Sequence, residues 1–161
     1  MSLDAAGYRK LIGHFATGVT VITTANGGLL HGMTANAITS VSLDPLLLLV
    51  CVDREAHAYE QLVHTGRFGV NILAEGQEDI SKLFAAKAEP ERGAMRGAAF
   101  RLGEHGTPVL DGSLAHIECA VTDRFDAGDH TIFIGTVLDG QVLSDAPPLV
   151  FYQATYRKLQ S

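Results

Sequence analysis

The stretch GVTVITTANGGLLHGMTANAITSVSLDPLLLLVCVD, residues 18–53, carries the clearest signals of the architecture. Its first part is rich in β-branched residues and runs into Asn26-Gly27, a dipeptide that strongly favours a hairpin turn. Extended character resumes over residues 29–43, and Pro45 then leads into LLLLVCVD, residues 46–53. Because that run is apolar without interruption, it predicts a strand covered on both faces. The stretch therefore predicts successive antiparallel strands.

Short helices and further strands are expected around this stretch. Apolar residues at helical spacing, with Asp4 as the N-cap, predict a helix within residues 3–15. Residues 87–108 show no helical or strand periodicity of apolar residues and are predicted to form a long surface loop. The other expected elements are helices in HAYEQLVHTG (57–66) and EDISKLFAAK (78–87), strands in FGVNIL (68–73), SLAHIECAVTDRF (113–125), HTIFIGTVLDGQVL (130–143) and PLVFYQATYRKL (148–159), and a turn at DAGD (126–129).

About seven strands with only three short helices favour an antiparallel, closed or nearly closed β-barrel with peripheral helices. A doubly wound sheet would need a helix after most strands. The 161 residues contain no visible repeat or linker, so we expect a single domain over residues 1–161.

Composition excludes several classes of function. The formal net charge is −6 and the lysines and arginines are scattered, which argues against nucleic-acid binding. The longest apolar run, Leu46–Val52, has seven residues, far fewer than the roughly 20 that cross a bilayer. The start, MSLDAAGYRK, does not resemble a secretory signal, so a cytoplasmic location is expected. Apolar residues make up 47% of the chain, a slight surplus that a partner subunit could cover.

The cysteines and histidines do not predict a metal site. Cys51 and Cys119 both lie in apolar, strand-like segments and are expected to be buried and reduced. The nearest approach to ligand spacing is His116 with Cys119, which has no second pair to complete a site.

The familiar nucleotide and hydrolase motifs are missing, and polar residues at strand positions take their place as candidates. Thr34-Ala35-Asn36 and Ser40-Val41-Ser42 put several hydrogen-bonding groups within nine residues. The edge of a flavin ring, with its carbonyls and nitrogens, requires such a surface. The alternative is that these side chains face solvent on a half-exposed strand.

Asn71 interrupts the apolar strand FGVNIL, and a buried amide needs hydrogen-bond partners. It either binds neighbouring backbone or points at a ligand in the barrel mouth. Arg54 follows VCVD and either binds a phosphate through its planar guanidinium or is a solvated surface residue.

Gly128-Asp129-His130 covers the end of the predicted turn at 126–129 and the start of the strand that follows it. His130 is either an exposed turn residue or a ring that contacts a nicotinamide, with Asp129 fixing its orientation. Near the C-terminus, Tyr156 either packs on the core or lies against a cofactor.

Taken in order, these pieces resemble the flavin reductase family, which has the FMN-binding split-barrel fold with Greek-key strand order. The matching stretches are FATGVTVITT (15–24), HGMTANAITSVSLDP (31–45), VCVDR (50–54), FGVNIL (68–73), ISKLFA (80–85), GTPVLDGSLAHIEC (106–119), AGDHTIFIGTV (127–137) and PLVFYQATYR (148–157). Together they cover nearly the whole chain.

The resemblance implies a reductase component that transfers a hydride from NADH or NADPH to FMN or FAD and supplies a separate flavin-dependent monooxygenase. It implies a homodimer with flavin sites near the interface. It also implies roles for individual residues: Thr34, Ala35, Asn36, Ser40, Val41 and Ser42 line the flavin, Asn71 and Phe84 close on it, Asp53 and Arg54 flank its polar tail, His130 meets the nicotinamide, and Tyr156 lies near the site.

This sequence departs from many relatives in having Leu46, Ile38 and His57 where they have proline, an aromatic residue and a small polar residue. The departure near His57 bears on phosphate contacts and hence on the choice between FMN and FAD. Two other functions remain open: a flavin- or haem-binding carrier or sensor without reductase activity, and an oxidase of the pyridoxamine-phosphate type. The reductase hypothesis needs no side-chain nucleophile. Hydride transfer requires only that the nicotinamide and flavin rings stack at a reactive distance, about 3–3.5 Å.

Overall fold

A computed structural model describes residues 2–160, and within them the chain is mainly β-structure with peripheral helices. The helices are α1 (Ala5–Ile12), α2 (His57–Thr65) and α3 (Glu78–Ala85), with a short 3-10 helix at Glu75–Gln77. The strands are β1 (Thr17–Gly18), β2 (Thr20–Asn26), β3 (Leu29–Ala35), β4 (Ile38–Leu43), β5 (Leu46–Asp53), β6 (Arg67–Ile72), β7 (Glu91–Arg92), β8 (Phe100–Leu102), β9 (Pro108–Leu110), β10 (Ala115–Ala127), β11 (His130–Val142), β12 (Val150–Tyr152) and β13 (Thr155–Arg157).

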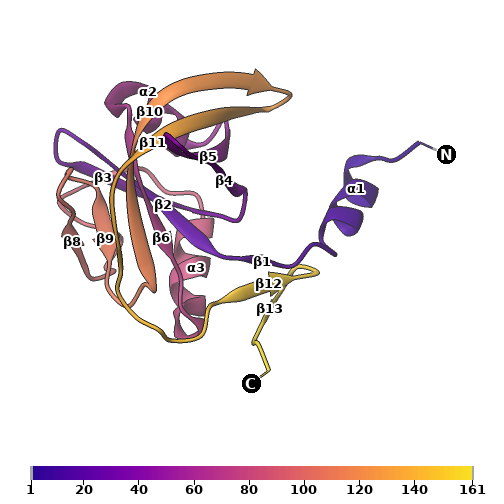
Figure 1. Cartoon of the computed structure of the whole chain (residues 1–161). Coiled ribbons are helices and arrows are strands. Elements are labelled where there is room, and N and C mark those ends of the chain that lie inside the picture. Colours follow the sequence, from indigo (N-terminus) through magenta and orange to yellow (C-terminus); the bar gives the residue numbers. More distant parts are fainter. Residues whose placement is uncertain (1, 161) are drawn as a thin grey trace.

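Eight of these strands form one antiparallel sheet in the order β4-β5-β11-β10-β6-β2-β3-β7. The sheet curls strongly (Figure 1), and β1-β12-β13 and β8-β9 form two small additional sheets. The expected class, an antiparallel split barrel with a few helices, is therefore confirmed.

Strand β2 separates two hydrophobic cores. Val21 and Ile22 are adjacent residues of this strand and both are buried, but they point to opposite faces of the sheet and belong to different hydrophobic clusters. Ile22 packs with Leu62 of α2, whereas Val21 packs in the cluster that includes Phe84 of α3. Each face of the sheet is thus closed by its own helix.

Local turn chemistry explains the two long hairpins. Gly27 and Gly28 connect β2 to β3 with φ angles of +57° and +87°, a conformation that glycine adopts without strain. Gly128, with φ of +60°, begins the turn between β10 and β11. Both turns lie where the sequence predicted them.

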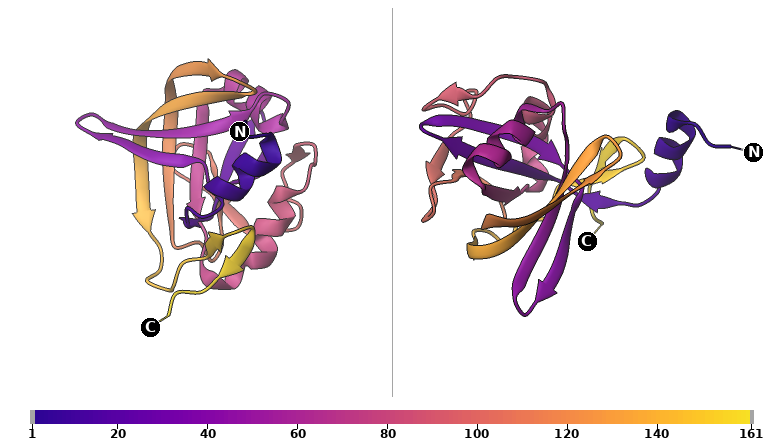
Figure 2. Two further views of the ribbon diagram at one scale, coloured as in Figure 1. Left: turned by 90° about the vertical axis from the view of Figure 1, so that its right-hand side faces the viewer. Right: turned by 90° about the horizontal axis from the view of Figure 1, so that it is seen from above.

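The N-terminal helix is shorter than the predicted range and stands away from the body of the molecule (Figures 1 and 2). Asp4 caps it as expected, accepting a hydrogen bond of 2.7 Å from the backbone N–H of Gly7. No residue of α1 is buried, although Tyr8 and Leu11 are apolar or aromatic. The stretch from Leu3 to Phe15 therefore presents an uncovered apolar surface.

Three expectations for the strands were wrong. LLLLVCVD is not covered on both faces: Leu48, Val50 and Val52 are buried on one face, while Leu49 and Cys51 on the other face are only partly buried, because they line the third cleft. The extended stretch 29–43 breaks between Ala35 and Ile38. The last segment is a tight hairpin, with Gln153 and Ala154 at positive φ, instead of one strand.

The segment 87–108 is also more ordered than a surface loop. It contains β7 and β8, and Met95 within it is buried in the core beside α3. Over residues 2–160, no helix has the length and apolar character needed to cross a membrane.

Candidate active site

Three neighbouring clefts follow β3 and the start of β4. The first and third, with volumes of about 320 and 540 Å³, fall in the range of small-molecule sites, about 300–1,000 Å³. Ala85 lines both the first and the second cleft, and Asn36 and Phe151 line both the second and the third. Because they share these residues, the clefts form one continuous depression.

The second cleft brings together four residues that were predicted to contact a flavin: Thr34, Ala35, Asn36 and Tyr156. The hydroxyl of Thr34 donates a hydrogen bond of 2.6 Å to the carbonyl of Ser81, and Ser81 Oγ lies 2.6 Å from the Tyr156 hydroxyl. Helix α3 and the C-terminal hairpin are thereby fastened to the end of β3. The cleft wall is fixed by contacts far apart in the sequence.

Asn36 lies at the junction of the second and third clefts and is exposed. In the described part of the chain its side chain makes no hydrogen bond. It follows the last residue of β3, so its amide is free to bind a ligand in either cleft.

The first cleft contains two more predicted residues, Asp53 and Phe84. Phe84 is 3% exposed and packs against Gly32, where a Cβ atom would lie 2.7 Å from its ring. Glycine at position 32 is therefore required for α3 to pack this closely on β3.

Sequence reasoning missed His31 and Lys87, which line the first cleft, and noted His57 only as a departure from the family. The rings of His31 and His57 lie 6.1 Å apart, edge to face. Burial, followed by the positive charges of His57 and Arg96, lowers the pKa of His31 to about 4. His31 is consequently neutral at physiological pH. The sequence offered one signal for His31: it directly precedes Gly32 in HGMTAN, the stretch that contains the predicted flavin contacts Thr34, Ala35 and Asn36.

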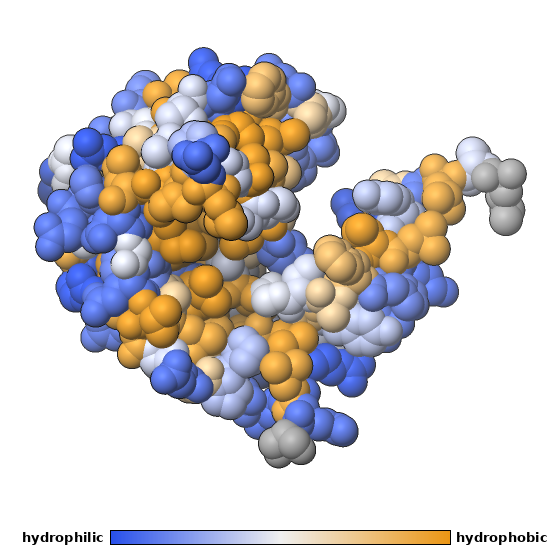
Figure 3. Space-filling model, in the orientation of Figure 1, coloured by the Kyte–Doolittle hydropathy of each residue, from blue (hydrophilic) through white to orange (hydrophobic). Residues whose placement is uncertain are grey.

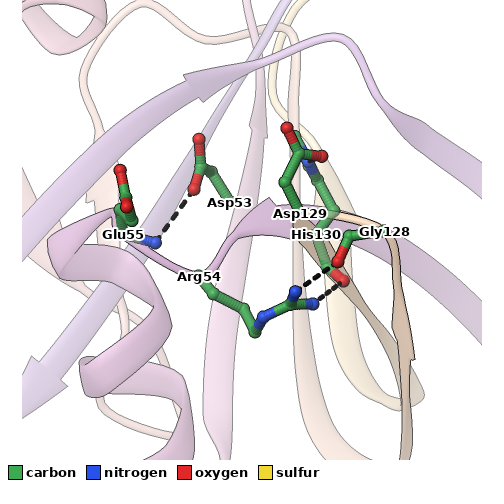
Figure 4. Close-up of polar contacts among 6 residues, drawn as sticks. All are labelled: Asp53, Arg54, Glu55, Gly128, Asp129 and His130. Atoms are coloured by element: carbon green, nitrogen blue, oxygen red, sulfur yellow. Dashed lines mark hydrogen bonds and ion pairs between the residues drawn. The ribbon is translucent and has the colours of Figure 1, made fainter.

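The GDH turn lies beside the end of β5 (Figure 4), and His130 is the cross-strand neighbour of Asp53, which lines the first cleft. His130 Nδ1 is 2.7 Å from Asp129 Oδ1, and 43% of the His130 side chain is exposed. His130 pairs across the sheet with Asp53, so the two side chains lie on the same face. The predicted orientation of His130 by Asp129 matches this contact. The hydrogen bond from His130, and then its charge, lower the pKa of the Asp129 carboxyl.

The guanidinium of Arg54 is bound to backbone carbonyls of the GDH turn. It donates to the carbonyl of His130 at 2.6 Å and to the carbonyl of Gly128 (Figure 4). Both contacts hold the turn between β10 and β11, so the planar donor pair proposed for a phosphate is already engaged. Arg54 therefore stabilises the turn that carries His130.

Asn71 also departs from its expected role. It is completely buried, its amide nitrogen donates to the carbonyl of Val21 at 3.2 Å, and its oxygen accepts from the backbone N–H of Leu110 at 2.9 Å. Both ends of its amide are thus satisfied by backbone, as in the alternative in which Asn71 binds its neighbours, and it lines none of the three clefts.

Ser40, Val41 and Ser42 lie on the edge strand β4, outside the three clefts. Val41 occupies an irregularity in the pairing of β4 with β5 and is 43% exposed. Ser42 accepts a hydrogen bond of 3.2 Å from the backbone N–H of Asp44. The described chain does not bring these three residues to Thr34 and Asn36 in one cleft.

An antiparallel split barrel with a long depression beside an exposed, carboxylate-oriented histidine defines a cofactor-binding barrel. Comparison with known proteins gives the particular family: the sequence profile of the Flavin reductase like domain matches residues 12–160. The chain belongs to the flavin reductase family.

Individual relatives agree with this assignment. An NADH-dependent flavin reductase from Rhodococcus sp. is 43% identical over 156 residues, which cover 94% of this chain and 85% of that protein. A flavin-dependent monooxygenase reductase subunit HsaB from Mycobacterium tuberculosis is 36% identical over 163 residues, covering 98% of this chain and 84% of that protein. The structure of the Streptomyces globisporus NADH:FAD oxidoreductase SgcE6, in complex with NAD and FAD fragments, matches with a TM-score of 0.90 and 34% identity, covering 99% of this chain and 98% of that one.

Proposed function

We propose that this chain is an NAD(P)H:flavin oxidoreductase that reduces FMN or FAD and supplies the reduced flavin to a separate flavin-dependent monooxygenase. The observation that carries the proposal is the continuous depression centred on Thr34, Ala35 and Asn36, with His130 paired across the strands to Asp53 of the adjoining first cleft. Membership of a family whose relatives bear reductase names supports the same activity.

The residues of the depression fit a flavin ring. An isoalloxazine offers carbonyls and ring nitrogens along one edge and an apolar body elsewhere, so it needs polar groups on one side and carbon on the other. The Asn36 amide and the Tyr156 hydroxyl are the polar groups, and Val19 and Phe151 supply apolar wall. In this proposal Thr34, Ala35, Asn36 and Tyr156 hold the ring, and Asp53 and Phe84 border the adjoining first cleft.

A bound flavin supplies the capacity to accept a hydride from a reduced nicotinamide. The protein has to bind both rings, hold them in contact and exclude water between them. His130 is the residue we assign to the nicotinamide, because its ring is accessible and its orientation is fixed by Asp129. Arg54 positions His130 through the backbone of the turn. NADH is the donor we expect first, since relatives are named as NADH-dependent.

We further propose that the active form is a homodimer in the cytoplasm and that residues 1–161 act as one flavin reductase-like domain.

Exposed apolar side chains support the dimer: Phe15 is 72% exposed, Leu43 is 82% exposed and Phe125 is 53% exposed. Figure 3 shows apolar residues gathered in the hollow between the body and the projecting N-terminal segment. Covering such a surface is favourable in water. Sedimentation equilibrium should give twice the chain mass, and a monomer at micromolar concentration would contradict the dimer.

The activity is tested anaerobically with purified protein, NADH or NADPH, and FMN, FAD or riboflavin. Rapid bleaching of the flavin absorption is the expected result, and the combination with the highest kcat/KM identifies both cofactors. Flavin binding without bleaching in any combination would overturn the reductase and favour the carrier function.

A further inference from the structure

The end of the β10–β11 hairpin opposite the GDH turn holds three potential metal ligands: His116, Glu118 and Asp139. Glu118 of β10 and Asp139 of β11 are directly paired across the strands. His116 lies two residues before Glu118 and therefore on the same face of the sheet. One ligand atom from each of the three lies within 4.8 Å of the other two.

The histidine has no protein partner for one of its nitrogens. His116 is only 4% exposed, and within residues 2–160 its Nδ1 is buried without a hydrogen-bond partner. Buried polar atoms in proteins are almost always paired, so an unpaired nitrogen on an imidazole ring that also approaches two carboxylates needs an explanation.

The carboxylates also retain free acceptor positions. Oε2 of Glu118 accepts hydrogen bonds from the N–H and hydroxyl of Thr107, but Oε1 accepts only a shared bond of 3.1 Å from the N–H of His105. The side chain of Asp139 makes no hydrogen bond or ion pair among residues 2–160. None of the ion pairs in that part of the chain brings a lysine or arginine to Glu118 or Asp139. Within residues 2–160, two carboxylates therefore converge with no lysine or arginine paired to either of them.

We propose that His116, Glu118 and Asp139 form a structural binding site for a divalent transition-metal ion, with Zn²⁺ as the best match. One imidazole nitrogen and two carboxylate oxygens are a donor set that Zn²⁺ accepts, with water completing the coordination. The ion neutralises the converging carboxylates and satisfies His116. It also links the β10–β11 hairpin, through Glu118, to the loop that contains His105 and Thr107.

The site is separate from the proposed flavin site. None of its three residues lines the clefts along β3. The metal is therefore expected to stabilise the protein without taking part in hydride transfer, and the two proposals can fail independently.

The test uses the full chain after treatment with EDTA and removal of the chelator. Isothermal titration with ZnCl₂ should show one ion per chain with a Kd at or below the micromolar range, and Zn²⁺ should raise the melting temperature. Asp139→Asn and His116→Gln should each weaken binding at least tenfold. Asp145→Asn, which makes the same charge change at an exposed position outside the cluster, should leave binding unchanged.

Coordination itself is read from the Co²⁺-substituted protein, whose visible absorption bands should appear in the wild type and change or vanish in His116→Gln. Circular dichroism of each variant establishes that it is folded. The proposal is overturned if the wild type binds no Zn²⁺ stoichiometrically, or if the folded Asp139 and His116 variants bind it as tightly as the wild type. Equal weakening by Asp145→Asn would also overturn it, because binding would then follow net charge alone.

Discussion

The two ends of the β10–β11 hairpin carry the same kinds of side chain in opposite environments. At the turn, His130 is 43% exposed and hydrogen-bonded to Asp129, which is 88% exposed. At the other end, His116 is 4% exposed and Glu118 is completely buried. At the first end, a soluble substrate can reach the histidine and its neighbouring carboxylate. At the second end, the buried histidine and carboxylate can influence only the surrounding protein structure.

The comparison also separates two kinds of energetic consequence. Charges in water interact weakly, so changes at the turn should alter ligand recognition and leave folding largely intact. A buried carboxylate that accepts several hydrogen bonds is costly to leave unpaired, so changes at Glu118 should act on folding first. Substitutions at the two ends test this division.

The largest effect is expected for Glu118→Gln, measured in the presence of EDTA to exclude any metal contribution. The amide presents N–H groups where the carboxylate accepted bonds from His105 and Thr107, so the free energy of unfolding should fall by about 2–4 kcal/mol. Urea denaturation measures it, with Glu89→Gln as an exposed control. If the free energy of unfolding fell only as much as in the control, Glu118 would not stabilise the fold through its hydrogen bonds to His105 and Thr107.

The same carboxylate gives the wild type a defined acid sensitivity. Burial raises the pKa of Glu118, but the hydrogen bonds from Thr107 and His105 outweigh it and hold the pKa below its usual 4.5. A lowered folded pKa means that the contribution to stability is complete above about pH 4.5 and disappears as the pH falls through the folded value. The stability difference between the wild type and Glu118→Gln should therefore shrink below pH 4.5. A difference that stays constant down to pH 3 would contradict this assignment.

The next effect is on activity. His130→Ala removes the ring assigned to the nicotinamide, so kcat/KM for NADH should fall about 10–100-fold. Flavin affinity and thermal stability should stay within experimental error, because the side chain is partly exposed and supports no core packing. Steady-state kinetics and flavin titration provide the measurements, and His64→Ala, a change on the surface of α2, is the control. Unchanged kinetics in His130→Ala would remove His130 from the proposed site.

Residues at the turn were largely predictable from sequence because their signals are local. Gly128-Asp129-His130 sits between two β-rich segments, and the hydrogen bond joins neighbouring residues. The hairpin at Gly27-Gly28 was predictable for the same reason. The C-terminal hairpin was missed because its turn residues, Gln153 and Ala154, adopt positive φ without the glycine or asparagine that usually signals it.

The buried end was not predictable, because its partners are distant in sequence. Asn71 in FGVNIL has the same pattern whether it binds a ligand or fastens a loop, and its partner Leu110 is 39 residues away. The linear pattern paired His116 with Cys119, three residues on, but residues three apart in a strand point to opposite faces. Its actual neighbour is Asp139, on the adjacent strand. Strand register, which no local motif encodes, determines that contact.

A smaller effect is expected for Arg54→Lys, which preserves the charge at the turn but removes the planar pair of donors. A single ammonium cannot hold the carbonyls of His130 and Gly128 in the same geometry, so the turn should loosen. We expect kcat/KM for NADH to fall about 3–10-fold and stability to fall by about 1 kcal/mol. Arg101→Lys, an exposed change on β8, is the matched control. If Arg54 instead binds the flavin phosphate, Arg54→Lys will weaken FMN and FAD much more than riboflavin.

The smallest effect is expected for Asp129→Asn. The asparagine oxygen can still accept the hydrogen bond from His130, so the ring keeps its orientation and only the charge of the carboxylate is lost. Because Asp129 is almost fully exposed, that charge is screened by water and salt, and KM for NADH should change by only about two- to threefold at low ionic strength. The difference from the wild type should shrink at high salt, which kinetics in increasing KCl would measure. A salt-independent loss as large as that of His130→Ala would mean that the turn relies on the carboxylate as strongly as the buried end relies on Glu118, and the contrast between the two ends would fail.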